Sequence, residues 1–453
     1  MAVDTARDNT TIPSGFTYLG QFVDHDLTFD TTPMPERQID PHAVHNFRTP
    51  HLDLDGLYGN GPTAHPHLYD RQDRAILLLG HNQPSADLQG NPIPRPTAQP
   101  FRNDLPRVKL QTDAEGKAPS GGTALIGDPR NDENLLVAQT HVAMLKFHNK
   151  VCATKKLGFE DTRRIVTWHY QWVVLKDFIA RLVTPTLLDH VLQCGPRFYK
   201  TEVDSYMPIE FSVAAYRIGH TMVRERYSHN RVFGPEIADL PTLFAFSELS
   251  GTHSPSPPLP FEKRIPVPDN WIIDWNRFYA PPTGKPDPNL NFSRRLDPFL
   301  APALGNLPNG SSNADHRNLA VLNLLRGLRM QLPSGQAVAA QLELPREKIL
   351  QSEQFGNAAD GVVARKAGFD TNTPLWYYIL KEAEIFGKGE RLGPVGANIV
   401  AEVFVGVLRN DKLSFLNAKE PFTPDPELGA RAGSYTMFDL LQFVGELNPI
   451  GRS

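Results

Sequence analysis

Apolar residues recur at helical spacing along most of the chain, whereas the alternation that is typical of β-strands is scarce. These patterns predict helices over residues 132–151, 161–183, 208–226, 315–331, 376–384, 394–409 and 436–447. Proline supplies 41 of the 453 residues, and many of them lie in residues 82–118 and 252–288, which we expect to be long surface loops. The sequence therefore predicts a mainly α-helical protein with little β structure, in which residues 1–453 form one large domain.

Composition and charge exclude several classes of protein. The chain is 40% hydrophobic and 21% charged, as globular proteins are, and its net charge of −4 without a basic tail gives no reason to expect nucleic acid as a partner. The most apolar stretch, residues 395–408, is interrupted by Glu402 and is too short to span a bilayer. No signal peptide is visible, so we expect a cytoplasmic protein, or a secreted one if the chain is a trimmed form. Cys152 and Cys194 are the only cysteines, which leaves one disulfide possible.

Four pairs of polar residues interrupt the apolar helices at a spacing of three or four. Gln21 and His25 share one helix face with Asp24 beside them, while Asp26 points away, so one side of this helix is suited to a cofactor and the other to a cation. The other pairs are Arg130 with Glu133, Arg217 with His220, and Asn323 with Arg326. One such pair is usually a surface or capping feature. The four together indicate a large polar object buried among the helices.

Residues 49–59, TPHLDLDGLYG, alternate oxygen-bearing residues with others, as a loop around a hard cation does. The spacing is not that of an EF-hand, because counting from Asp53 puts Tyr58 at position six and Ala64 at position twelve. The loop is therefore a calcium site of another type or a solvated turn that contains glycine.

The segments GQFVDHDLTF, GDPRNDEN, YRIGHT and LAVLNLLR follow one another from residue 20 onward. In these four segments the chain resembles the animal-type haem peroxidases of the peroxidase–cyclooxygenase superfamily. The resemblance covers most of the chain and implies a bacterial-like single catalytic domain with the haem-dependent peroxidase fold. It also implies a bound haem, either haem b or an ester-linked form, together with Ca²⁺.

On the peroxide side of the haem, the resemblance implies roles for three residues. His25 would be the base that takes a proton from peroxide and returns it to the leaving oxygen, for which the ordinary pKa of histidine is suited. Arg130 would stabilise charge on the departing oxygen with its fixed guanidinium. Gln21 would hold water or a small anion near the iron.

On the other side, the resemblance makes His220 the axial ligand of the iron. Asn323 would accept its second ring N–H, and Arg217 and Arg326 would pair with the haem propionates.

Asp24 and Glu133 resemble the two acids that many family members join to haem as esters. The next residue, Asn134, stands where chloride-oxidising members carry a methionine that forms a third link, so we do not expect that link or strong chloride oxidation. For calcium, the resemblance implies five ligands: Asp26, Thr49, the carbonyl of His51, Asp53 and Asp55. Many family members have serine at the position of Asp55.

The predicted activity is that of a peroxidase in which hydrogen peroxide oxidises the haem to a ferryl form. This form would oxidise phenols, iodide, bromide or thiocyanate, with a part in the response to oxidative stress.

Two alternatives remain open. A fatty-acid dioxygenase or cyclooxygenase would carry a radical-forming tyrosine three residues before the proximal histidine, where this chain has Arg217. Tyr216 lies one place earlier and is expected to face elsewhere, because one residue is a rotation of about 100° on an α-helix. The other alternative is a non-catalytic, calcium-stabilised binding module, which would not need both His25 and Arg130.

Overall fold

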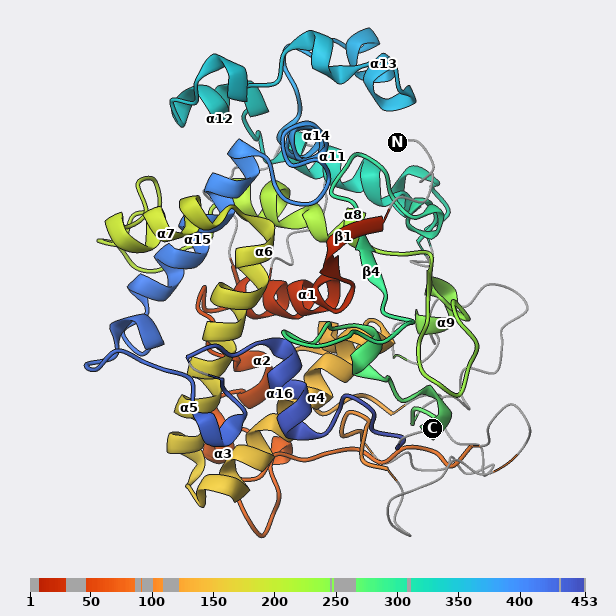
Figure 1. Ribbon diagram of the computed structural model, residues 1–453, viewed down its shortest axis with the longest axis vertical. Helices are drawn as coiled ribbons and strands as arrows, with labels where there is room; N and C mark the ends of the chain where they lie inside the picture. Colours follow the sequence, from red (N-terminus) through yellow and green to blue (C-terminus); the bar gives the residue numbers. More distant parts are fainter. Residues whose placement is uncertain are drawn as a thin grey trace.

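Helices dominate the regular structure, and most of them surround one long apolar core (Figure 1). The computed structural model describes residues 8–29, 46–85, 91, 101–108, 122–244, 247, 266–307, 311–431 and 433–451. The longer helices are α1 (Gly15–Leu27), α4 (Leu135–Lys155), α5 (Phe159–Trp172), α7 (Pro185–Cys194), α11 (Leu319–Arg329), α12 (Gly335–Gln341), α13 (Ala359–Lys366), α14 (Leu375–Ile385), α15 (Pro394–Asn410) and α16 (Met437–Val444).

Shorter elements connect these helices. The short α-helices are α2 (Asp55–Tyr58), α3 (Gly61–Ala64), α6 (Ala180–Leu182), α8 (Gly219–Met222) and α9 (Leu240–Phe244). A 3-10 turn, η3 (Pro129–Asp132), precedes α4, and a π-helical segment, η4 (Val173–Ile179), joins α5 to α6. Strand β1 (Asp8–Pro13) pairs antiparallel with β4 (Phe292–Arg294), and β2 (Arg226–Tyr227) pairs antiparallel with β3 (Ala238–Asp239). The prediction of a mainly α-helical fold with little β structure is therefore confirmed.

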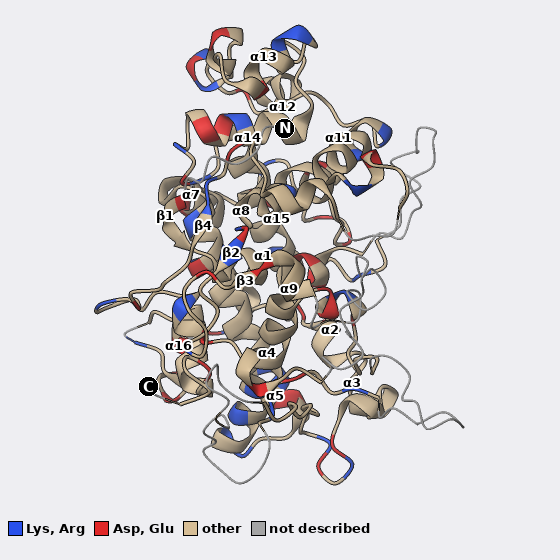
Figure 2. Cartoon of the chain, turned by 90° about the vertical axis from the view of Figure 1, so that its right-hand side faces the viewer, with Lys and Arg blue, Asp and Glu red and all other residues tan. Residues whose placement is uncertain are grey.

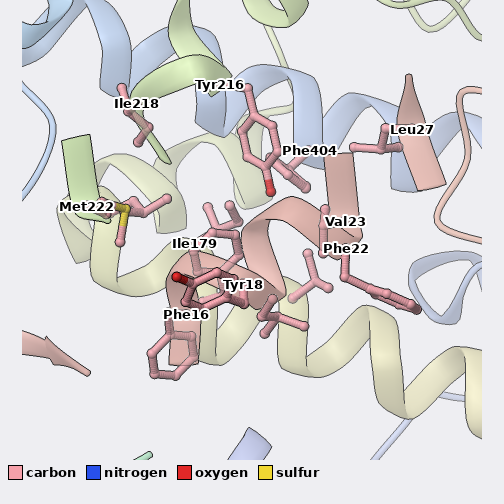
Figure 3. Packing of buried hydrophobic residues seen from close by; sticks show 14 of the residues in the cluster. Phe16, Tyr18, Phe22, Val23, Leu27, Ile179, Tyr216, Ile218, Met222 and Phe404 are labelled. Atoms are coloured by element: carbon pink, nitrogen blue, oxygen red, sulfur yellow. The ribbon is translucent and has the colours of Figure 1, made fainter. Parts of the chain in front are cut away.

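Helix α1 lies in the middle of the molecule, between α14 and α15 on one side and α4, α5 and α16 on the other (Figure 1). Its apolar residues are buried against three other parts of the chain, as Figure 3 shows for the cluster of Phe16, Tyr18, Phe22, Val23, Leu27, Ile179, Tyr216, Ile218, Met222 and Phe404. The helix starts at Gly15, where the ring of Tyr279 occupies the space of a side chain and the Tyr279 hydroxyl donates to the Gly15 carbonyl at 2.8 Å. A central, almost wholly buried helix is thus the frame for the polar residues that it carries.

Several predicted helices agree with the structure to within a few residues, notably α4, α14, α15 and α16. The start of the second predicted helix was wrong, since α5 begins at Phe159 after Gly158 and not at Asp161. The predicted helix over residues 208–226 was also wrong in form. It is divided into a π-helical segment η5 (Glu210–Ala214), a 3-10 segment η6 (Ala215–Ile218) and α8, and it ends at Met222.

The prediction of a surface loop for residues 252–288 was wrong for residues 266–280 and is confirmed for residues 281–288, which are mostly exposed and irregular. Residues 252–265 lie outside the described part of the chain. Between residues 266 and 280 several large apolar side chains are at most 1% exposed, namely Val267, Ile272, Ile273, Trp275, Phe278 and Tyr279. Within residues 82–118, where 86–90, 92–100 and 109–121 are not described, Asn82, Asp104 and Leu105 are buried. A high proline content therefore does not by itself place a segment at the surface, because the apolar residues between 266 and 280 are part of the core.

Two smaller points concern the cysteines and the helices. Cys152 is buried and Cys194 is exposed, and both are free, so the disulfide that the sequence left possible does not form. No helix in the described ranges is long and apolar enough to cross a membrane.

Candidate haem and calcium sites

A cavity of about 430 Å³ lies beside α1 and brings together residues from distant parts of the sequence. One wall carries Gln21, Asp24 and His25 of α1 with Arg130, Glu133 and Asn134 around η3. The facing wall carries residues 216–220 with Met222 and Val223. The rest is mostly apolar, with Phe178, Leu182, Leu240, Leu243, Phe244, Leu304, Leu307 and Leu319. An apolar cavity with a few convergent polar groups is typical of a cofactor site.

His25 is held by a relay of buried side chains. Its Nδ1 lies 2.8 Å from Oδ1 of Asn131, and Nδ2 of Asn131 lies 3.1 Å from Nδ1 of His141. Because an amide oxygen only accepts, Nδ1 of His25 carries the proton and Nε2 keeps its lone pair. Burial lowers the pKa of His141 to about 3, so this second ring is neutral. The relay therefore presents His25 as a base.

Gln21 bridges the two residues that follow η3. Its Nε2 donates to Oε2 of Glu133 at 3.0 Å, and its Oε1 accepts from Nδ2 of Asn134 at 3.0 Å. Oδ1 of Asn134 also caps α4 by accepting from the Val137 amide at 3.0 Å. The same Oε2 of Glu133 lies 3.9 Å from Nε2 of His25, and burial raises the pKa of Glu133. The side chain of Gln21 is thus held by two hydrogen bonds, and one of its two amide hydrogens is already donated to Glu133.

Arg130 is held mainly by its own turn. Its Nε and Nη2 donate to the carboxylate of Asp128, with the shortest distance 2.6 Å, and Nη2 also donates to the carbonyl of His25 at 2.9 Å. The guanidinium lies over the ring of Phe29, 4.5 Å from its centroid. Nη1 makes no hydrogen bond to the described residues. Because Arg130 lines the cavity, Nη1 is free to donate to a ligand there.

On the facing wall, Nδ1 of His220 lies 2.9 Å from Nδ2 of Asn323. Here the asparagine amide donates to the histidine ring, whereas the prediction had the ring donating to the asparagine oxygen. Burial, followed by the positive charge of Arg217, lowers the pKa of His220 to about 3 and keeps the ring neutral. Nε of Arg217 donates to the Ser212 carbonyl at 3.0 Å, and its Nη1 lies 3.5 Å from Oδ1 of Asn323. Burial lowers the pKa of Arg217, because it disfavours the charged guanidinium. Within the described ranges no carboxylate pairs with Arg217 to offset this cost. A buried cation of this kind favours an anionic ligand in the cavity.

The remaining predicted cofactor residues are divided. Asp24 lines the cavity, where its Oδ1 accepts from the Thr28 hydroxyl at 3.1 Å. Arg326 is half-buried on α11 and is not among the residues that line the cavity. Asn323, on the same helix, lies behind His220. The structure thus brings Asp24, Glu133 and Arg217 to one cavity and leaves Arg326 outside its wall.

Tyr216 was expected to face elsewhere, but it lines the cavity. Its ring stacks on Phe211 with centroids 4.8 Å apart. Its buried hydroxyl, which has no hydrogen-bond partner among the described residues, is directed toward α1 (Figure 3). Burial, followed by the negative charge of Asp24, raises the pKa of Tyr216. The expectation assumed a regular α-helix, whereas Tyr216 lies in the 3-10 segment η6. A 3-10 helix has about three residues per turn, which changes the direction of each side chain.

The predicted calcium ligands also lie together. Carboxylate oxygens of Asp26, Asp53 and Asp55 are within 4.8 Å of one another, and the acidic positions of α1 and α2 are red in Figure 2. Among the described residues, Oδ1 of Asp55 is buried without a hydrogen-bond partner, as a carboxylate oxygen that awaits a cation would be, whereas the Asp26 carboxylate interacts with the Tyr170 hydroxyl. Burial and mutual repulsion raise the pKa of Asp26, and that of Asp53 to about 6.

The other two predicted calcium ligands border the same cluster. The Thr49 hydroxyl lies 3.1 Å from Oδ2 of Asp53. The His51 imidazole lies 2.8 Å from the Ser205 hydroxyl, so this side chain is directed away and leaves the carbonyl as the available donor. This set of oxygen donors fits a hard cation.

Sequence reasoning missed four residues that support the two sites: Arg48, Asp128, Asn131 and His141. The pattern GDPRND contained Asp128 and Asn131, but nothing in their spacing shows which side chains they contact.

Sequence comparisons relate part of the chain to peroxidases. A family model described as animal haem peroxidase matches residues 32–243. A peroxidase-like protein of Margaritifera margaritifera is 26% identical over 265 residues, which cover 49% of this chain and 33% of the relative. Human thyroid peroxidase is 25% identical over 219 residues, or 45% of this chain and 22% of the relative. The chain thus spans a third or less of the length of these relatives.

Among solved structures, peroxidase A from Dictyostelium discoideum has a TM-score of 0.60 at 14% identity, covering 100% of this chain and 88% of that one. A fatty acid α-dioxygenase of Oryza sativa with palmitic acid has a TM-score of 0.58 at 15% identity, covering 99% of this chain and 75% of that one. Both share the fold. Residues 32–243 therefore resemble an animal haem peroxidase domain, and the chain as a whole shares the fold of these solved structures.

Proposed function

We propose that the protein is a hydrogen-peroxide-dependent haem peroxidase that oxidises small donors such as phenols, iodide, bromide or thiocyanate. The similarity of residues 32–243 to animal haem peroxidases supports oxidoreductase chemistry. The observation that carries the proposal is one cavity with a base and an arginine, His25 and Arg130, on one wall and a neutral histidine, His220, on the other.

The residues of the cavity fit haem. His220 would bind the iron through Nε2, which requires its proton on Nδ1 and the Asn323 amide turned so that its oxygen faces the ring. That turn directs the Asn323 nitrogen toward Arg217, which would then pair with a haem propionate. Asp24 and Glu133 line the wall from which ester links to haem could form. When bound, haem supplies the iron that reacts with peroxide and stores its oxidising equivalents.

The side chains of the distal wall have separate tasks. Nε2 of His25 would take the proton from the first peroxide oxygen and return it to the second, which leaves as water. Arg130 would donate through Nη1 to the leaving oxygen while Asp128 holds its other nitrogens. Once His25 is protonated, Oε2 of Glu133 at 3.9 Å would stabilise the positive charge.

Calcium would be held by Asp26, Thr49, the His51 carbonyl, Asp53 and Asp55. Because Asp26 follows His25 directly on α1, the ion would fix the helix that carries the base.

One observation favours a second candidate, the fatty-acid dioxygenase. Tyr216 lies in the cavity wall, where its phenol could be oxidised and then take a hydrogen atom from a fatty acid. Oxygen uptake with palmitate that disappears in Tyr216→Phe, while phenol oxidation by peroxide is kept, would favour this candidate.

The test of the proposal is peroxide-dependent oxidation of a phenol and of iodide by the haem-loaded protein. Loss of a single charged donor at a reacting oxygen typically lowers the rate about 100- to 1,000-fold, so we expect that loss in Arg130→Leu. His25→Leu should lose about 100-fold or more. Arg71→Leu, an exposed position outside the cavity, is the matched control and should keep full activity. Equal activity in Arg130→Leu and wild type would refute the assignment.

A further inference from the structure

Arg48 joins the acidic calcium cluster to the turn that carries Arg130. Its Nη1 pairs with Oδ2 of Asp55 at 2.9 Å, and its Nη2 pairs with Oδ2 of Asp128. The side chain of Arg48 is only 10% exposed, and that of Asp128 is fully buried. A guanidinium held in this way, with one nitrogen on each carboxylate, has its position fixed by both.

Asp128 in turn determines where Arg130 lies. Its carboxylate accepts from Nε and Nη2 of Arg130 and from the Arg130 backbone amide at 2.9 Å. Asp128 therefore has two cationic partners, Arg48 and Arg130. Both guanidinium groups lie over the ring of Phe29, at 5.8 and 4.5 Å from its centroid respectively. A change in the place of Arg48 must be compensated at Arg130, because both share one buried anion.

At the calcium end, the carboxylate of Asp55 has two different oxygens. Oδ2 is paired with Arg48, whereas Oδ1 is buried beside Asp26 and Asp53 without a hydrogen-bond partner in the described ranges. A cation on Oδ1 would hold Asp55 in its present orientation. Without the cation, repulsion among the three carboxylates favours rotation of Asp55 away from the cluster and hence away from Arg48.

The backbones of the two sites are also in contact. The Gly127 amide donates to the Gly56 carbonyl at 2.9 Å, and a Cβ on Gly127 would lie 2.8 Å from the carbonyl oxygens of Asp55 and Gly56. Displacement of the Asp55 segment is therefore transmitted directly to the turn that begins at Gly127.

We propose that Arg48 is a positioning residue that couples occupancy of the calcium site to the placement of Arg130 in the distal cavity. This inference rests on the proposed function, since it requires both the calcium site and the distal role of Arg130. The coupling is separate from the connection through Asp26, which acts on His25. By linkage, a ligand that Arg130 stabilises should in turn tighten calcium binding by the same factor.

The test uses the haem-loaded protein after calcium is removed with a chelator, with cyanide as the probe of the distal side. Calorimetry measures calcium binding, and the Soret band measures the cyanide dissociation constant with and without calcium. We expect calcium to tighten cyanide binding about fivefold in wild type, at the lower end of typical couplings. Arg130→Leu should retain only the smaller effect that passes through Asp26 and His25.

Arg48→Met should reduce the calcium effect to the value in Arg130→Leu, and the double variant should reduce it no further. Arg48→Lys should also reduce the calcium effect, because an ammonium keeps the charge but lacks the rigid fork that gives each carboxylate its own nitrogen, and it guards against a folding defect in Arg48→Met. The matched control is Arg163→Met, since Arg163 lies over Tyr58 and its charge acts on Asp53 but it has no contact with Asp128. Arg163→Met should keep the wild-type calcium effect on cyanide.

A wild-type calcium effect in both Arg48 variants would overturn the inference and leave the proposed function intact. Absence of calcium binding to wild type, or of haem and cyanide binding, would overturn the proposed sites and this inference with them.

Discussion

The relay from His25 through Asn131 to His141 can be tested by its contribution to stability. Asn131 is 2% exposed and provides the hydrogen bonds of both rings, at 2.8 and 3.1 Å. His141 is fully buried, and its other ring nitrogen, Nε2, has no partner, so the Asn131→Leu substitution leaves this ring without a hydrogen bond.

The expected cost follows from these contacts. Each lost hydrogen bond contributes about 0.5–1.5 kcal/mol, and a buried polar group left unsatisfied costs about 1–3 kcal/mol, so Asn131→Leu should destabilise the protein by about 2–4 kcal/mol. Leucine has the same number and branching of side-chain heavy atoms as asparagine, which limits the packing change to the larger size of its methyl groups.

A double-mutant cycle with His141→Phe, measured by urea unfolding, isolates the pair. The substitution of phenylalanine for His141 keeps an aromatic ring beside Phe22, whose centroid lies 5.9 Å from that of His141. When both residues are apolar, the unsatisfied His141 is gone, so the double variant should be more stable than the sum of the single effects by about 1 kcal/mol or more. Additive losses, within about 0.5 kcal/mol, would show that the relay makes no energetic contribution.

Two further predictions concern stability. Burial lowers the pKa of His148 to about 4, so below its ordinary value of 6.5 the unfolded state binds the proton first, and stability falls as the pH is lowered. The stability advantage of wild type over His148→Gln should therefore shrink by about 1.4 kcal/mol per pH unit between pH 6.5 and about 4 in urea unfolding, and an advantage independent of pH would contradict this. Gly127→Ala should cost about 1–3 kcal/mol by overpacking, measured in the same way, whereas Gly234→Ala, with open space around it, should cost little; equal effects would refute the close approach.

The sequence predicted the elements with strong helical periodicity, because one face of each is buried against the core. Helices α14 and α15 are examples, and their buried residues are apolar except for Lys381, Glu382 and Glu402. It did not predict the breaks after Ala214 and Ile218, since π-helical and 3-10 turns have no residue pattern of their own. This is why the direction of Tyr216 was predicted wrongly.

The candidate sites were predicted unevenly for a similar reason. Residues close in sequence, such as Gln21, Asp24 and His25, reveal their common face through helix geometry. Arg48 and Asp128 are far apart in sequence, and only the packing of α2 against η3 brings them together. The side chains that orient the predicted base and arginine therefore became visible only in three dimensions.

The claim that His220 and the facing wall form a haem site is tested most directly by titrating the protein with haem and recording the absorption spectrum. We expect wild type to bind haem with a well-defined Soret band. His220→Ala should bind it weakly or with a shifted band, and added imidazole should restore the wild-type spectrum by replacing the lost ligand. Failure of wild type to bind haem, or an unchanged spectrum in His220→Ala, would contradict the assignment.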